Sequence, residues 1–215
     1  MSKIKICGLK RPEDIRMVNE LLPDFCGFII DFPKSHRSRT PDEVRQLVKG
    51  LDRAHVVPVG VFVNAPVETV AALLQDGTIA MAQLHGSEDN PYIRQLRTLT
   101  DRPIIKAYAV KTPETLREAA GSIADYVLLD QGKGSGMTFD WSSFGTPAAR
   151  EIFGPTGTPK GDWFLAGGLN HENIAEAIRR FSPYAVDLSS AVESDGVKDY
   201  EKTRRIIETV RSIKP

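Results

Sequence analysis

The sequence predicts an α/β fold, a closed (β/α)8 barrel of the TIM-barrel class. Three observations predict it: short apolar runs recur along the whole chain, segments of helical periodicity separate them, and polar or glycine residues follow several of the runs. Regular alternation of strands and helices indicates a parallel sheet. A chain of 215 residues can bury one sizeable core, so we expect a single domain over residues 1–215.

The predicted strands are mostly continuous runs rich in Val, Ile and Phe, which is typical of strands covered on both faces. Eight such runs lie at residues 3–7, 25–30, 56–62, 80–85, 103–109, 126–129, 163–166 and 184–189. An open doubly wound sheet is the structural alternative. Against it, residues 7–11 read Cys-Gly-Leu-Lys-Arg and lack the glycine spacing of a dinucleotide-binding turn.

Helix start signals lie between these runs. Thr40 and Glu43 form a capping box around Pro41, which stands at the first helical position. Further starts are expected at Pro12, Pro66, Thr112, Asn170 and Asp199, with another helix around Ile93, Leu96 and Leu99. Residues 154–161, which include Pro155 and Pro159, are expected to form a surface loop.

Composition excludes several classes of partner. Lys plus Arg and Asp plus Glu both number 28, so the net charge of zero gives no reason to expect nucleic acid or an anionic membrane. No apolar run approaches membrane-spanning length, and the N-terminus is too short and too charged for a signal peptide. Two cysteines make no disulfide framework, so we expect a cytoplasmic protein. The four histidines show no metal-ligand spacing, so we expect no metal.

Two loops near the C-terminus favour a phosphate site. Gly167 and Gly168 follow the seventh predicted strand, and Ser189 and Ser190 follow the eighth. In barrels of this class these two loops often bind phosphate, because glycines let backbone N–H groups approach an anion and serines add hydroxyl donors. Taken alone, each loop is as consistent with a structural role as with phosphate binding. The structural role would be a tight turn at Gly167 and Gly168, and an ordinary cap at Ser189 and Ser190. Their occurrence after consecutive strands favours phosphate binding.

Cys7 and Asp130 each end an apolar run, where barrel enzymes place reactive side chains. A buried cysteine is often a small packing residue, and we interpret Cys26 in that way. Cys7 is a candidate base, although a free thiol with a pKa near ~8.5 is only slightly ionised at neutral pH. Asp130 either caps a turn or donates a proton beside the Gly-rich residues 131–138.

Two further side chains are candidates for binding. Arg37 follows the second predicted strand, and a guanidinium at a barrel mouth can hold a carboxylate through two hydrogen bonds. His85 closes the fourth run, where a histidine is as consistent with a structural role as with a catalytic one.

These residues resemble the phosphoribosylanthranilate isomerase family of tryptophan biosynthesis, whose members are barrels of the ribulose-phosphate-binding type. Eight motifs match in order, at residues 5–8 (Lys-Ile-Cys-Gly), 34–35 with Arg37, 60–64, 83–86 (Gln-Leu-His-Gly), 128–130, 134–141, 166–169 (Ala-Gly-Gly-Leu) and 187–193. Any one motif is weak evidence. Eight in the right order are specific.

The resemblance implies a cofactor-free Amadori rearrangement, an aldose–ketose isomerisation of a phosphoribosyl substrate by a monomer or homodimer. Asp130 is then the general acid that opens the furanose ring, and Cys7 is the base that removes the C2 proton. Arg37 matches the arginine that holds the anthranilate carboxylate, and Asp187 is expected to contact the sugar. The phosphate site falls on Gly167, Gly168, Ser189 and Ser190, and His85 joins the substrate-binding set.

Several positions depart from the family pattern. Ala191 stands where a glycine is common after the paired serines, so a left-handed backbone there would be strained. Asp31, Phe32 and His36 also differ from the residues expected around Lys34. These changes concern the geometry of loops rather than the chemistry.

Two other functions are rivals. A histidine-pathway isomerase runs the same chemistry but uses an aspartate as base, where this chain has Cys7, and needs a second phosphate loop for which residues 61–64 offer no glycine pair. A noncatalytic phosphosugar-binding barrel would bind ligand without turnover. Both proposed proton-transfer residues are present, which disfavours that second rival.

Overall fold

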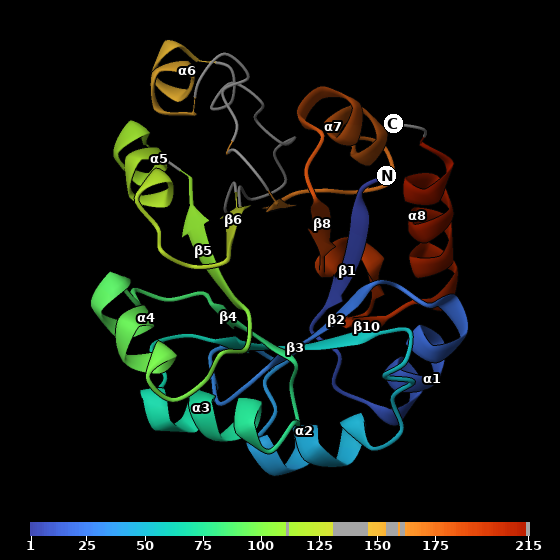
Figure 1. Cartoon of the computed structure of the whole chain (residues 1–215). Helices are drawn as coiled ribbons and strands as arrows, with labels where there is room; N and C mark the ends of the chain where they lie inside the picture. The colour runs from blue at the N-terminus through green and yellow to red at the C-terminus, as the bar shows by residue number, and fades with distance from the viewer. Residues whose placement is uncertain (111, 131–145, 154–158, 160–161, 214–215) are drawn as a thin grey trace.

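The computed structural model describes residues 1–110, 112–130, 146–153, 159 and 162–213. Eight strands form a closed barrel in which every strand pairs in parallel with its sequence neighbours and β8 pairs with β1 (Figure 1). The strands are β1 (Lys3–Cys7), β2 (Phe25–Ile29), β3 (Val57–Phe62), β4 (Met81–Leu84), β5 (Ile104–Ala109), β6 (Tyr126–Asp130), β7 (Trp163–Ala166) and β8 (Ala185–Leu188). The predicted barrel is confirmed, and the open sheet is excluded.

Helices follow the strands around the outside of the barrel (Figure 1). They are α1 (Pro12–Leu21), α2 (Pro41–Val48), α3 (Val67–Gln75), α4 (Asn90–Arg97), α5 (Pro113–Ala120), α6 (Pro147–Phe153), α7 (Ile174–Phe181) and α8 (Tyr200–Ser212). Helix α6 is not predicted from the sequence. Among the described residues, we find no helix with the length and hydropathy needed to cross a lipid bilayer.

The predicted helix starts hold with one exception, although Thr112 stands at the start of α5 without a side-chain cap hydrogen bond. Thr40 accepts a hydrogen bond from the Glu43 backbone while Glu43 accepts one from the Thr40 backbone, as a capping box requires. The prediction that Asn170 caps α7 is wrong, because Asn173 is the residue at that cap. The Asn170 side chain instead accepts hydrogen bonds from the backbone N–H groups of Glu172 and Asn173, forming a turn ahead of the helix.

Alternate residues of each strand face either the barrel interior or the surrounding helices. On β1, Ile4 and Ile6 pack in the outer apolar layer, so Lys5 and Cys7 face inward. The interior is filled by an apolar cluster whose members are Phe25, Val59, Met81, Ile105, Ala107, Leu128, Phe164, Ala166 and Ala185. Buried polar residues on three strands, Lys5, Gln83 and Asp187, therefore stand out against an apolar interior.

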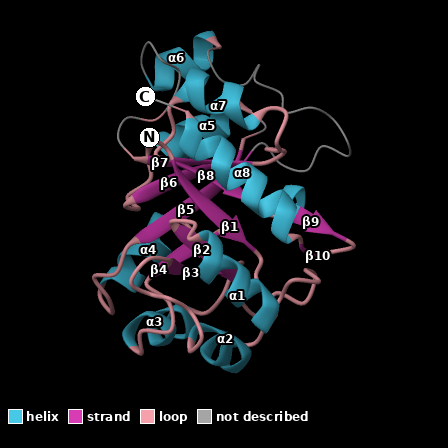
Figure 2. Ribbon diagram, turned by 90° about the vertical axis from the view of Figure 1, so that its right-hand side faces the viewer, coloured by secondary structure: helices cyan, strands magenta, loops and turns pink. Residues whose placement is uncertain are grey.

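A short antiparallel hairpin precedes the last helix. Its strands are β9 (Glu193–Ser194) and β10 (Val197–Lys198), and they follow the 3-10 turn η2 (Ser190–Val192). Figure 2 shows the hairpin beside the beginning of α8. Asp195 and Gly196 join the two strands with positive φ angles of 51° and 74°. The hairpin brings Glu193 and Lys198 to the edge of the barrel mouth.

Candidate active site

Cys7 lies at the carboxyl end of β1, buried and facing Gly27 on β2, its direct cross-strand neighbour. A Cβ atom built on Gly27 would lie 2.8 Å from Cys7 Sγ and 3.1 Å from Lys5 Nζ. The missing side chain of Gly27 therefore makes room for the thiol and the ammonium group. Burial raises the pKa of the Cys7 thiol, Asp187 adds to the rise, and Lys5 and Lys198 oppose it.

Lys5 and Asp187 form a buried ion pair across β1 and β8. Lys5 Nζ donates to Asp187 Oδ2 at 2.8 Å, and the two residues are register partners. Burial lowers the pKa of Lys5, but Asp187 and Cys7 together raise it above its ordinary value. Burial likewise raises the pKa of Asp187, against the lowering by Lys5. Asp187 Oδ1 is buried without a hydrogen-bond partner among the described residues, which leaves an acceptor in the barrel mouth.

His85 lies between Gln83 and Asp130. The Gln83 side-chain amide nitrogen is 2.9 Å from His85 Nδ1, and His85 Nε2 is 3.7 Å from Asp130 Oδ2. Partial burial lowers the pKa of His85, whose side chain is 37% exposed, while Asp130 and Asp187 oppose that shift. A neutral imidazole that accepts from the Gln83 amide carries its proton on Nε2, the nitrogen that faces Asp130. This contact joins the ends of β4 and β6.

Arg37 is held by a protein carboxylate. Its Nε and Nη2 atoms donate to Glu193 at 2.7 and 2.5 Å, and Lys198 Nζ donates to the same carboxylate at 2.8 Å. Partial burial raises the pKa of Glu193, yet the two cations hold it at about 2. The arginine stem crosses over Gly8, where an added Cβ would lie 2.5 Å from Arg37 Cδ. Two cations and one carboxylate leave a net charge of +1 at this edge of the mouth.

The two loops predicted to bind phosphate have different structures. Gly167 and Gly168 both have positive φ angles, 84° and 66°, which side chains other than glycine rarely adopt. In the other loop, Ser189 Oγ donates to the Cys7 carbonyl at 3.0 Å, and Lys198 Nζ donates to the Ser189 carbonyl at 2.9 Å. The Ser189 hydroxyl therefore uses its one proton in a hydrogen bond to the end of β1. Ser190 begins the 3-10 turn η2.

A comparison with protein families identifies the family to which the chain belongs. The family model for N-(5'-phosphoribosyl)anthranilate (PRA) isomerase matches residues 4–209. The chain belongs to this family. The N-(5'-phosphoribosyl)anthranilate isomerase of Endomicrobium trichonymphae is 42% identical over 226 residues, covering 100% of this chain and 99% of the relative. That of Thermoanaerobacter sp. strain X514 is 38% identical over 219 residues, covering 100% of both.

Solved structures of PRA isomerases agree with the barrel. The crystal structure from Thermotoga maritima has a TM-score of 0.83 at 32% identity and covers 99% of this chain and 100% of its own. A PRA isomerase in complex with reduced 1-(o-carboxyphenylamino)-1-deoxyribulose 5-phosphate has a TM-score of 0.81, also at 32% identity, with coverage of 99% and 100%. The family and the fold expected from the motifs are confirmed, and the chain is an isomerase.

The structure thus brings Cys7, His85, Asp130 and Asp187 to the carboxyl end of the PRA isomerase barrel. Sequence reasoning missed Lys5, Glu193 and Lys198 as parts of this site. Lys5 carried a signal, because a lysine between two isoleucines in the middle of a predicted barrel strand is unusual. The Gly-rich residues 131–138 lie outside the described residues.

Two further observations concern backbone strain and metal ligands. The strain expected at Ala191 is absent, because the described non-glycine residues with positive φ are Leu22, Asp31, Asn64, Ser182 and Asp195. Within the described part of the chain, no group of three or more His, Cys, Asp or Glu side chains is arranged to hold a metal ion.

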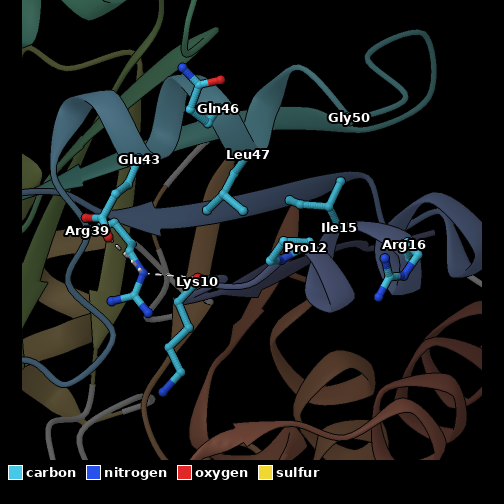
Figure 3. Close-up of a pocket in the computed structure, with 9 residues that line it drawn as sticks. All are labelled: Lys10, Pro12, Ile15, Arg16, Arg39, Glu43, Gln46, Leu47 and Gly50. Carbon is cyan, nitrogen blue, oxygen red and sulfur yellow. Dashed lines mark hydrogen bonds and ion pairs between the residues drawn. The ribbon is translucent and has the colours of Figure 1, made fainter.

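A groove of about 470 Å³ lies elsewhere, between α1 and α2 (Figure 3). Ile15 and Leu47 form its apolar part, and Arg39 at its edge donates to the Lys10 carbonyl at 3.0 Å. None of the predicted site residues lines this groove.

Proposed function

We propose that the chain converts N-(5'-phosphoribosyl)anthranilate to 1-(2-carboxyphenylamino)-1-deoxyribulose 5-phosphate by acid–base catalysis without a cofactor. The reaction is an intramolecular redox change, because the aldose carbon is reduced while C2 is oxidised to a ketone. One observation carries the proposal: a PRA isomerase barrel holds a thiol on β1 and a carboxylate on β6 at the same end. Those are the two groups that the rearrangement requires.

The first half of the proposed reaction opens the sugar ring. Asp130, as the acid, donates a proton to the furanose ring oxygen, the C1–O bond breaks, and the anthranilate nitrogen supplies the electron pair for a protonated Schiff base. The neutral imidazole of His85 at 3.7 Å supports this step, since its Nε2–H can stabilise the carboxylate that Asp130 becomes.

The second half moves the hydrogen from C2. Cys7, as the thiolate, removes the C2 proton, so an S–H bond forms and the C2–H electron pair moves between C1 and C2. The C1–N pair returns to nitrogen and gives the enolamine, which tautomerises to the aminoketone. Each positioned proton transfer contributes on the order of 10²–10⁴-fold to the rate.

The charged and polar groups around the barrel mouth indicate how the substrate would bind. Arg37 would hold the anthranilate carboxylate through its remaining donors, with the net charge of +1 on Arg37, Glu193 and Lys198 favouring an anion. The phosphate would lie between the Gly167–Gly168 turn and the backbone at Ser189 and Ser190. The free acceptor on Asp187 Oδ1 suits a ribose hydroxyl donor.

We also propose that the enzyme works in the cytoplasm as a monomer or a homodimer. Both cysteines are free thiols, which suits a reducing compartment. The Thermotoga maritima relative is described as dimeric.

Turnover of the anthranilate substrate, followed by its loss of fluorescence, tests the proposal. Cys7→Ser and Asp130→Asn are each expected to lower kcat by at least about 10²-fold with little effect on KM, because each removes one proton-transfer group. Cys26→Ala is the matched control, since that thiol packs in the outer layer away from the mouth, and it should keep kcat. Binding of substrate without any turnover by the wild-type chain would support the noncatalytic rival instead.

A further inference from the structure

Lys5 has an unusual position for a lysine. It is 0% exposed and faces the barrel interior two residues before Cys7, so both side chains lie on the same face of β1. Removing an ammonium group from water costs several kcal/mol unless partners replace the water. The ion pair with Asp187 offsets that cost, but two apolar residues at these positions would avoid it altogether. A structural role alone therefore gives no reason for the charge.

The geometry at Gly27 ties Lys5 to the thiol. The point above Gly27 where a Cβ atom would stand lies close to both Cys7 Sγ and Lys5 Nζ, at 2.8 and 3.1 Å. The ammonium and the thiol therefore flank the same point in the barrel. A thiolate on Cys7 would have Lys5 as its buried positive neighbour.

The other groups around the thiol do not replace this cation. The charged or titratable groups that act on Cys7 are Lys5 on its own strand, Asp187 on β8, Lys198 on β10, Arg37 after β2 and the Cys26 thiol on β2. Arg37 and Lys198 both donate hydrogen bonds to the Glu193 carboxylate on the hairpin, so part of their positive charge is balanced there. Lys5 is the cation that opposes the effect of burial on the thiol most strongly.

We infer that Lys5 is a positioning residue for the base: its ammonium group, held by Asp187, balances the negative charge of the Cys7 thiolate inside the barrel. The inference rests on the proposed function for the identity of the reaction. The thiol releases its proton to solvent, and Lys5 stays protonated throughout. When Cys7 takes the C2 proton of the substrate, the S–H bond reforms and the ion pair of Lys5 with Asp187 remains.

The inference is tested by alkylation of Cys7 with iodoacetamide as a function of pH. A Cys26→Ala background leaves one thiol, and the thiolate is the reactive form. Lys5→Met is expected to move the midpoint of the alkylation rate upward by at least about one pH unit, which is about a tenfold slower reaction at a fixed pH below the midpoint. The same variant should lower kcat and shift the rise of kcat with pH in the same direction.

Lys106→Met is the matched control. Among the described barrel strands, Lys106 on β5 is the second buried lysine. It lies on the outer face, since its neighbours Ile105 and Ala107 face the interior, and it donates to the Gly86 carbonyl at 2.6 Å and lies 3.5 Å from Glu88. Its removal should leave the alkylation midpoint unchanged. An equal midpoint in Lys5→Met and Lys106→Met would overturn the inference.

Asp187→Asn gives a second arm with the opposite sign. It removes a negative charge but leaves Lys5, so the alkylation midpoint should fall below that of the wild type. This arm decides the question even where Lys5→Met does not fold, and an unchanged midpoint in Asp187→Asn would overturn the inference. Alkylation needs no turnover, so failure of the proposed reaction would be seen separately as a wild-type chain without isomerase activity.

Discussion

Two cysteines on neighbouring strands show how one residue type takes two roles. Cys7 and Cys26 are both buried, but strand alternation turns Cys7 toward the barrel mouth and Cys26 toward the helices. Burial raises the pKa of both thiols and Lys5 opposes the rise at both, while Lys198 adds to this opposition at Cys7 and Arg53 adds to it at Cys26. The difference lies in the neighbours rather than in the residue.

At the same scale, Gly27→Ala should damage the site by filling the space beside the thiol. The new Cβ would lie 2.8 Å from Cys7 Sγ, and overpacking of this kind costs about 1–3 kcal/mol. We expect kcat to fall by at least about tenfold, because Cys7 must move. Gly121→Ala is the control, since its added Cβ meets nothing closer than 3.6 Å. A Gly27→Ala enzyme with wild-type kcat would show that the position of the thiol is not critical.

Much of the site could be predicted at the level of single residues. Cys7, Asp130 and Asp187 lie at or near strand ends in the sequence, and the structure brings those ends to one edge of the barrel. The partner of Arg37 could not be predicted, because Glu193 lies 156 residues away and the contact depends on the hairpin. A local pattern cannot reveal such a long-range pair.

Among the elements, regular strands and well-capped helices were predictable, and short ones were not. Helix α6 has seven residues, of which only Ala149 and Phe153 are buried, so it carries almost no helical periodicity. The hairpin did have a signal: Asp195 and Gly196 form the Asp-Gly pair that favours a tight turn between two strands. Because the two strands have only two residues each, no strand-like run flanks the Asp-Gly pair in the sequence.

The hairpin also gives a prediction about pH and stability. Glu193 has a folded pKa of about 2 against an ordinary value of 4.5, so its ion pairs stabilise the fold fully above pH 4.5 and lose their effect as the pH falls toward 2. Glu193→Gln should therefore lower the free energy of unfolding at pH 7 by roughly 1 kcal/mol, a modest value because the site lies near solvent. The difference from wild type should shrink steadily between pH 4.5 and 2.

Urea unfolding across that pH range measures the effect. Glu208→Gln is a matched control, because that carboxylate pairs with Arg204 on the exposed face of α8. Its substitution should change the free energy of unfolding little at any pH. A constant difference between Glu193→Gln and wild type from pH 7 to 2 would contradict the assigned ion pairs.

On the scale of the whole molecule, the barrel separates function from stability along its axis. Reactive groups lie at the carboxyl ends of the strands, whereas aromatic side chains gather at the opposite end. Tyr184 stacks on Tyr126 with ring centroids 5.5 Å apart and meets Phe164 edge-on at 5.8 Å, while Lys3 Nζ lies 5.0 Å from the Tyr184 ring. This aromatic cluster closes the amino-terminal end of the interior.

Tyr184 directly precedes β8 and Asp187 lies near the carboxyl end of that strand, so substituting each in turn should separate stability from activity. Tyr184→Leu is expected to lower the free energy of unfolding by about 1–3 kcal/mol, because it loses aromatic contacts and packing, yet to keep kcat well below the unfolding temperature. Asp187→Asn should lower kcat, because it removes the proposed acceptor for a ribose hydroxyl and the carboxylate that holds Lys5. Urea unfolding and the fluorescence assay on both variants measure the contrast. A Tyr184→Leu enzyme that stays folded but loses kcat would show that the two ends of the barrel are coupled.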